Sequence, residues 1–200
     1  MKKIAFIAFL LAVSVAAGRA QESRQDISLS GTALVEPFIA SSTDVYVHSN
    51  YALGGLVSYR YMLTPSSAVE GNYSITYQNK ITYHASPNVY QILTRTQEVS
   101  AEYVRSFTFR KYNPFVEAGP GAVVFLPIRN MGTQNLDVKQ QMQMAAFYGA
   151  GIAREVSPSF DIRVEYRGIV TKVPTFGVTA FGTNKWYNIY MPVIGVAYHF

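Results

Sequence analysis

The sequence predicts an all-β fold, an eight-stranded antiparallel up-and-down transmembrane β-barrel that follows a cleaved signal peptide. Three observations lead to this prediction. Long segments alternate between apolar and polar side chains, their connections alternate between short and long, and aromatic residues lie near both ends of the segments. The stretch "DIRVEYRG" at 161–168 illustrates the first observation, because its four charges fall on one side of an extended chain and its apolar residues on the other.

The first twenty residues form a leader. Lys2 and Lys3 precede an apolar run over 4–17, which Ser14 alone interrupts, and small residues follow up to Ala20. This pattern is typical of a secretory signal peptide cleaved after Ala20. We therefore expect a signal peptide at 1–20, a periplasmic N-terminal tail at 21–26 and the barrel at 27–200. No later segment approaches the roughly twenty apolar residues that a spanning helix needs.

Charge and composition exclude several functions. The chain has 17 basic and 12 acidic residues, and the leader holds three of the basic ones, so the mature chain is left with a net charge of +2. These basic residues are scattered, so no nucleic acid is expected as a partner. The chain has no cysteine, and its histidines, His48, His84 and His199, lie far apart, so neither a metal nor another cofactor is expected.

Eight segments read as strands. They cover about 27–39, 50–63, 68–78, 95–109, 115–126, 140–153, 160–171 and 187–200. Each approaches the length of about 9–11 residues that a tilted strand needs to cross a bilayer. In the third, Val69, Gly71, Tyr73, Ile75 and Tyr77 share one face, opposite Glu70, Asn72, Ser74, Thr76 and Gln78. Such alternation indicates an apolar band around a polar or small interior.

The connections and the aromatic residues follow the same architecture. Short turns at 64–67, 110–114 and 154–159 alternate with long links at 40–49, 79–94, 127–139 and 172–186. Aromatic residues fall on the turn side (Tyr61, Phe107, Phe109, Phe160, Phe200) and on the loop side (Tyr51, Tyr77, Trp186, Tyr190). Two aromatic bands and a segregation of turns from loops are typical of transmembrane barrels, and a soluble sandwich has no reason to show either.

The last residues, "VIGVAYHF", carry a resemblance. Gly195, Tyr198 and Phe200 resemble the C-terminal signal that the barrel-assembly machinery reads, although Val193 stands at its polar position. The mature chain resembles the small outer-membrane β-barrel proteins of the OmpA, OmpX and opacity type. That resemblance implies an eight-stranded barrel in the outer membrane of a Gram-negative cell. Its partners would be outer-membrane lipid, lipopolysaccharide and the assembly machinery.

The charged residues of the strands are predicted to face the lumen. A basic residue that faces lipid at mid-membrane costs about 2–4 kcal/mol, so Arg163 and Arg167 must point inward. A buried charge needs a partner, and both signs are available. The predicted lumen network consists of Glu36, Arg60, Glu70, Glu102, Glu117, Asp161, Arg163, Glu165 and Arg167. A lumen filled in this way argues against a constitutive channel.

Some features could belong to an enzyme that modifies lipid A. Pro37, Pro120 and Pro192 fall within predicted strands, and interrupted ladders of this kind are similar to those of the outer-membrane lipid A palmitoyltransferase. Alternatively, these prolines lie at a bulge or above the membrane. The first long link contains Asp44, His48 and Ser49, the residue types that acyl transfer needs, and His84 with Ser86 resembles the His-x-Ser element of a lipid A deacylase. Chance produces such combinations readily in polar loops.

The last long link is unusually apolar for a loop in water. Phe176, Phe181 and Trp186 are its aromatic residues, and exposed apolar loops mark contact surfaces. They could meet an extracellular ligand, lipopolysaccharide, or one another in a packed cap. The sequence thus favours a non-enzymatic outer-membrane barrel with a structural or adhesin-like surface role through its loops. The alternatives are an outer-leaflet lipid A acyltransferase or deacylase and, less well supported by the polar interior, a secreted lipocalin-like binder.

Overall fold

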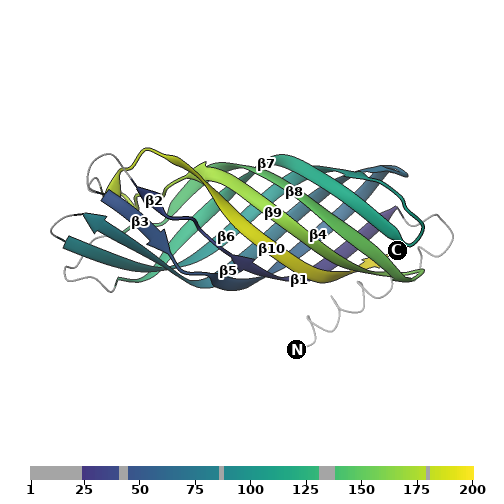
Figure 1. The fold of residues 1–200 in the computed structure, drawn as a ribbon, viewed down its shortest axis with the longest axis horizontal. Coiled ribbons are helices and arrows are strands. Elements are labelled where there is room, and N and C mark those ends of the chain that lie inside the picture. Colours follow the sequence, from purple (N-terminus) through teal and green to yellow (C-terminus); the bar gives the residue numbers. More distant parts are fainter. Residues whose placement is uncertain (1–23, 41–44, 86–87, 131–137, 179–180) are drawn as a thin grey trace, which may run out of the picture.

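The computed structural model describes residues 24–40, 45–85, 88–130, 138–178 and 181–200. Eight long strands form a closed antiparallel barrel, because each pairs with its sequence neighbour in the wall and the first pairs with the last (Figure 1). The long strands are β1 (Gln25–Leu34), β4 (Ala52–Thr64), β5 (Ser67–Ala85), β6 (Asn88–Ser106), β7 (Tyr112–Asn130), β8 (Gln141–Ser157), β9 (Phe160–Lys172) and β10 (Trp186–His199). The predicted fold class is confirmed.

The expected leader at 1–20 lies outside the described residues. The first strand begins at Gln25, so Asp26 belongs to the wall and not to the expected tail. Within the described ranges, no helix reaches the length and apolar character that a bilayer span requires.

The seam between β1 and β10 closes the barrel. Its ladder runs from Asp26 paired with His199 to Thr32 paired with Val193. Pro192 has no N–H to donate. Beyond it, toward the long links, which we call the upper end of the barrel, an isolated bridge joins Val35 to Tyr190 through hydrogen bonds of 2.8 and 2.9 Å. The seam is therefore hydrogen-bonded both below and above this proline.

Two of the three prolines predicted to lie within strands do so, and the third does not. Pro192 pairs with Tyr166 of β9, and Pro120 pairs with Ala146 of β8. Pro37 was expected inside the first strand, but it follows β1, which ends at Leu34. This strand is shorter than predicted because the chain turns away from the wall after the bridge at Val35.

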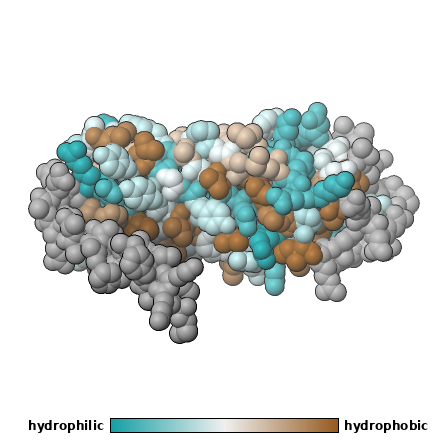
Figure 2. Space-filling model, turned by 180° about the vertical axis from the view of Figure 1, so that it is seen from behind, coloured by the Kyte–Doolittle hydropathy of each residue, from teal (hydrophilic) through white to brown (hydrophobic). Residues whose placement is uncertain are grey.

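The outer wall carries the apolar side of each alternating strand. Exposed side chains such as Leu29, Val57 and Val164 stand on the outside, while their polar sequence neighbours are buried. Figure 2 shows apolar and weakly polar side chains over the middle of the wall, with strongly hydrophilic side chains mainly toward its ends. Of the predicted aromatic residues, Tyr61 and Phe160 lie near the turns and Tyr51 and Trp186 near the long links. Tyr77 and Tyr190 lie within β5 and β10, because these strands continue past them.

Two of the four long links were wrongly predicted as loops. The link at 79–94 continues the sheet, because β5 extends to Ala85 and β6 begins at Asn88. The link at 40–49 contains β2 (Ile39–Ala40) and β3 (Val45–Ser49), and β3 pairs with the upper half of β5, above β4. Polar residues hid the alternation of this region, in which Ile81, Tyr83, Tyr90 and Ile92 are buried. Figure 1 shows these strands projecting beyond the barrel at the end opposite the C-terminus.

The C-terminal residues complete the turn-side end of the barrel. The Phe200 N–H donates to the Gln25 carbonyl at 3.0 Å, and the rings of Tyr198 and Phe200 lie 6.1 Å apart. A Cβ at Gly195 would overlap the Ser30 side chain of β1. Gly195 thus has a packing role at the seam, where the two strands approach closely.

Candidate functional site

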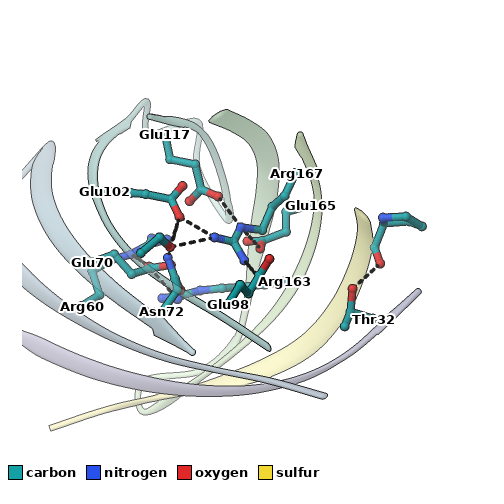
Figure 3. A network of polar contacts seen from close by, with 12 residues as sticks. Thr32, Arg60, Glu70, Asn72, Glu98, Glu102, Glu117, Arg163, Glu165 and Arg167 are labelled. Atoms are coloured by element: carbon teal, nitrogen blue, oxygen red, sulfur yellow. Dashed lines mark hydrogen bonds and ion pairs between the residues drawn. The ribbon is translucent and has the colours of Figure 1, made fainter. Parts of the chain in front are cut away.

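The lower half of the lumen, toward the turns, is organised around Arg167. This side chain is fully buried, and its two terminal nitrogens donate to Glu98 (2.9 Å) and to Glu102. Its Nε lies 3.4 Å from Glu117 Oε1 and 3.9 Å from Glu165 Oε1. Figure 3 shows these carboxylates, contributed by β6, β7 and β9, converging on one guanidinium.

Two further arginines pair closer to the turn-side mouth. Arg60 Nε donates to the carboxylate of Glu70, its cross-strand neighbour. Arg163 Nη2 donates to Asp26 at 2.7 Å, and its Nη1 lies 3.9 Å from Glu70. Glu70 therefore joins the two arginines, which come from β4 and β9.

Asp161 and His199 line the mouth itself. His199 Nε2 lies 2.9 Å from Asp161 Oδ2, and Nδ1 of the same ring lies 3.9 Å from Asp26. A small cavity of about 150 Å³ opens among these residues, Arg60 and Arg163. The mouth is thus polar and mixed in charge.

We refer to these buried groups together as the lumen charge network. Its members are Asp26, Arg60, Glu70, Glu98, Glu102, Glu117, Asp161, Arg163, Glu165 and Arg167. In the described part of the chain it brings together every residue predicted for it except Glu36. Two members were not predicted from the sequence. Asp26 was assigned to the tail because the first strand was started too late, and Glu98 lay on the polar face of its segment but was left out.

Glu36 lies apart, at the opposite end of the lumen. It follows β1 directly after Val35, the residue that bridges to Tyr190, and it accepts a hydrogen bond from Asn79 Nδ2 at 2.9 Å. Ser49 and Tyr187 also lie against this carboxyl. Burial raises the pKa of Glu36 to about 7, because a charged carboxylate loses its hydration there.

An aromatic plug fills the upper half of the lumen. We define it as Tyr83, Tyr90, Phe125, Phe147, Phe176 and Phe181, all of which are buried. The rings of Tyr83 and Phe181 stack at 4.3 Å, and Tyr90 meets Phe181 edge-on at 5.2 Å. Phe147 forms the lower boundary of the plug, with its ring 5.6 Å from the Arg167 guanidinium carbon.

The link between β9 and β10 is fixed inside the barrel mouth. The Tyr83 hydroxyl donates to the Pro174 carbonyl at 2.6 Å. Gln141 Oε1 accepts from the backbone N–H groups of Thr175 (2.7 Å) and Phe176 (2.9 Å). Phe176 has a φ of 51°, which a bulky residue adopts only when its surroundings hold it there. These contacts anchor the phenylalanines of this link.

The exposed contact surface predicted in the last link is wrong for two of its three residues. Phe176 and Phe181 are 0% exposed, so they form part of the core and cannot meet an external ligand. They are buried because the apolar link supplies the filling that the upper lumen needs, which is the packed cap left open by the sequence. Trp186 is 60% exposed, and Lys172 Nζ lies 5.5 Å from its ring.

The candidate catalytic residues do not form a site in the described part of the chain. Asp44 and Ser86 lie outside the described residues. His48 is exposed, and its ring stacks with that of His84 at 5.9 Å. Ser49 points to the other side of β3, as the next residue of a strand must, and its hydroxyl donates to Asn79. The serine and its candidate base therefore face away from each other.

The lumen is filled at two levels, by the charge network on the turn side and by the aromatic plug on the long-link side. Among the described residues, no group of three or more histidines or acids is placed to hold a metal ion. The side chains of the lumen therefore fill the interior and support the barrel wall.

Removing the central guanidinium should destabilise the barrel strongly. Arg167→Ala leaves four carboxylates without their shared cation, and breaking a buried ion pair costs about 3–5 kcal/mol. Urea unfolding, followed by the fluorescence of the single tryptophan, Trp186, measures this loss. Lys111→Ala, at an exposed position in a turn, is the matched control and should change stability by less than about 0.5 kcal/mol. An Arg167→Ala effect as small as that of the control would contradict the role assigned to the network.

Stability should depend on pH through Glu36. An acid whose folded pKa is raised favours the folded state fully below its ordinary pKa, and this stabilisation is lost as pH rises from 4.5 to about 7. Glu36→Gln keeps an acceptor for Asn79 but carries no charge. The variant should therefore match the wild type at pH 4 and exceed it by about 3 kcal/mol at pH 8. Glu155→Gln, at an exposed position, is the control. A difference between Glu36→Gln and wild type that does not grow with pH would refute the assignment.

Comparison with known proteins agrees with this geometry. The match to the crystal structure of Neisserial surface protein A covers 89% of this chain and 98% of the Neisserial chain, with a TM-score of 0.58 and 13% sequence identity. The match to OprG of Pseudomonas aeruginosa covers 90% of this chain and 97% of the OprG chain, with a TM-score of 0.58 and 13% sequence identity. The match to the N-terminal barrel domain of OprF from the same organism covers 90% of this chain and 100% of the OprF domain, with a TM-score of 0.52 and 17% sequence identity. At these identities the likeness shows the fold.

No curated protein sequence matches the chain. The family model described as outer membrane protein beta-barrel domain matches residues 5–200, nearly the whole sequence. Together with the closed eight-stranded wall and its apolar exterior, this match identifies the chain as a member of the outer-membrane β-barrel domain family, located in the Gram-negative outer membrane.

Proposed function

We propose that this protein is a closed, non-enzymatic surface barrel whose extracellular end makes contacts outside the cell. The observation that carries the proposal is the extracellular hairpin, defined as residues 79–85 of β5 and 88–94 of β6. It continues the wall past Tyr77, one of the loop-side aromatic residues (Tyr51, Tyr77, Trp186 and Tyr190) that form the upper aromatic band. Its inner face contributes Tyr83 and Tyr90 to the plug, where both rings contact Phe181. Its outer face would project beyond the membrane.

The rigidity of the hairpin supports a role in binding. It is hydrogen-bonded to β3 on one side, and on the other side its strand β6 pairs with β7 up to Asn130. A preformed surface loses little conformational entropy when a partner binds. The face that carries His48, His84 and Val89 is the contact surface that we propose, in place of the buried phenylalanines of the last link.

Transport and catalysis receive less support. The lumen charge network and the aromatic plug leave the described interior filled, which disfavours a conducting pore. An acyltransferase or deacylase would need a serine, a base and an acid in reach of one another, and His48 and Ser49 face opposite ways.

Display of the protein on a laboratory strain tests the contact role. Cells that display the wild type should adhere to cultured epithelial cells severalfold better than cells without it. The double variant His48→Ala, Val89→Ser should lose most of this gain, because it alters the proposed contact face while leaving Tyr83 and Tyr90 in the plug. Lys111→Ala, on the periplasmic side, should adhere like the wild type.

Two outcomes would count against the contact role. Equal adherence of the wild type and the double variant would sink the proposed face. A mass spectrum of lipid A that gains or loses an acyl chain when the barrel is expressed would favour the enzymatic alternative.

Export and assembly are part of the same proposal. We expect residues 1–20 to be removed, so that N-terminal sequencing of the barrel extracted from membranes should begin at Gln21. A chain that retains Met1 in the outer membrane would contradict this expectation. Gly195, Tyr198 and Phe200 are the residues that the assembly machinery is proposed to read.

A further inference from the structure

The outer wall is hollowed along the seam between β1 and β10. We define this seam groove by Ile27, Leu29, Gly31 and Ala33 on β1 with Ile194 and Val196 on β10. Its upper part has a volume of about 510 Å³ and its lower part about 340 Å³. The two parts follow one another along the outer side of β1, the lower at Ile27 and Leu29 and the upper at Gly31 and Ala33.

Small residues produce the upper part of the groove. Gly31 has no side chain, Ala33 has a short one, and the larger side chains of Leu53 on β4 and Val164 on β9 form the two rims. The ladder beneath the groove is interrupted at Pro192, between the pair Thr32–Val193 and the bridge Val35–Tyr190. The groove is therefore a feature of the backbone and of residue size, and not of one side-chain rotamer.

The shape of the groove favours a lipid chain over a second copy of the protein. A twofold interface would place the same surface on both partners, and two concave surfaces do not fill each other. An extended acyl chain is narrow and apolar. The upper part is lined by Pro192, Val193 and Ile194 of β10, directly below the loop-side aromatic residue Tyr190, so it faces the leaflet nearer the long links.

The wall above the groove shows which lipid fits. On the outer face of β9 and β10, the rings of Tyr166 and Tyr190 come first, 6.1 Å apart. Nearer the extracellular end, Asn188 Nδ2 donates to the Tyr148 hydroxyl at 2.7 Å. The strands end at the pair Lys172 and Trp186, where the ammonium group lies over the indole ring.

This order, from apolar groove through hydrogen-bonding groups to a cation, matches the order of chain, linkage and anionic headgroup in a lipid. The cation lies at the extracellular interface, where the lipid of a Gram-negative outer membrane is phosphorylated lipid A. We propose that the seam groove and the β9–β10 face above it bind one lipid A molecule, with an acyl chain in the upper groove and a phosphate at Lys172. This proposal does not depend on the adhesive role.

Lipid retention tests the site. The full-length mature barrel is reconstituted with lipid A and phosphatidylcholine, extracted in mild detergent, and the lipid A bound per barrel is measured by mass spectrometry. Gly31→Leu should fill the upper groove and lower retained lipid A about tenfold. Lys172→Gln should lower it about fivefold, by removing one cation near the headgroup.

Matched controls separate the site from general effects. Gly71 also lies on the outer face, and a Cβ there would meet no atom within 4 Å, so Gly71→Leu adds the same bulk elsewhere on the wall. Lys111→Gln removes a cation at the other end. Both controls should retain lipid A like the wild type, and a gel shift on heating confirms that each variant is folded.

The remaining outcomes would overturn the proposal. Lipid A retention equal in Gly31→Leu and Gly71→Leu would mean that the groove holds no specific chain. A loss of phosphatidylcholine in Gly31→Leu, with lipid A unchanged in Lys172→Gln, would assign the groove to a phospholipid. If Gly31→Leu fails to fold, Lys172→Gln still decides, because unchanged retention in that variant contradicts the headgroup site.

Discussion

The structure depends on one constraint, which is that backbone N–H and C=O groups within hydrocarbon must find partners in the chain itself. A sheet meets it only by closing, and here closure rests on the pairing of β1 with β10. The close approach at Gly195, the bridge between Val35 and Tyr190 and the position of Pro192 between them all belong to this seam. Once the seam is closed, the alternation of each strand necessarily divides the side chains between lipid and lumen.

Closure with eight strands leaves an interior that side chains must fill, and this chain fills it in two ways. Below, Arg167 forms ion pairs with Glu98, Glu102 and Glu117, because an unpaired buried charge would cost several kcal/mol. Above, the link between β9 and β10 folds inward and supplies Phe176 and Phe181. The two fillings meet where Arg167 packs against the ring of Phe147. A cation over an aromatic face is a favourable contact between a charged region and an apolar one.

A filled interior moves the proposed activities to the outside of the barrel. The extracellular hairpin presents a hydrogen-bonded strand surface, and the seam groove presents a concave apolar surface on the outer wall. The two surfaces differ in chemistry because the hairpin lies beyond the loop-side aromatic residues, whereas the upper groove lies on their turn side, toward the middle of the membrane. A lipid A molecule held at Lys172 and Trp186 would border the extracellular end, so the two sites could operate side by side without sharing residues.

The sequence by itself determined the fold class, the eight spanning strands and the inward direction of the charges. These follow from a period of two and from the cost of an arginine in lipid, which are local properties of residues such as Arg163 and Arg167. Tertiary structure alone decided which carboxylate meets which arginine, since Glu98 and Arg167 lie on strands far apart in the sequence. It also decided that the apolar last link contributes Phe176 and Phe181 to the plug and that residues 79–85 and 88–94 are strands. Those outcomes depend on the space left inside the closed wall, a quantity that no stretch of sequence carries.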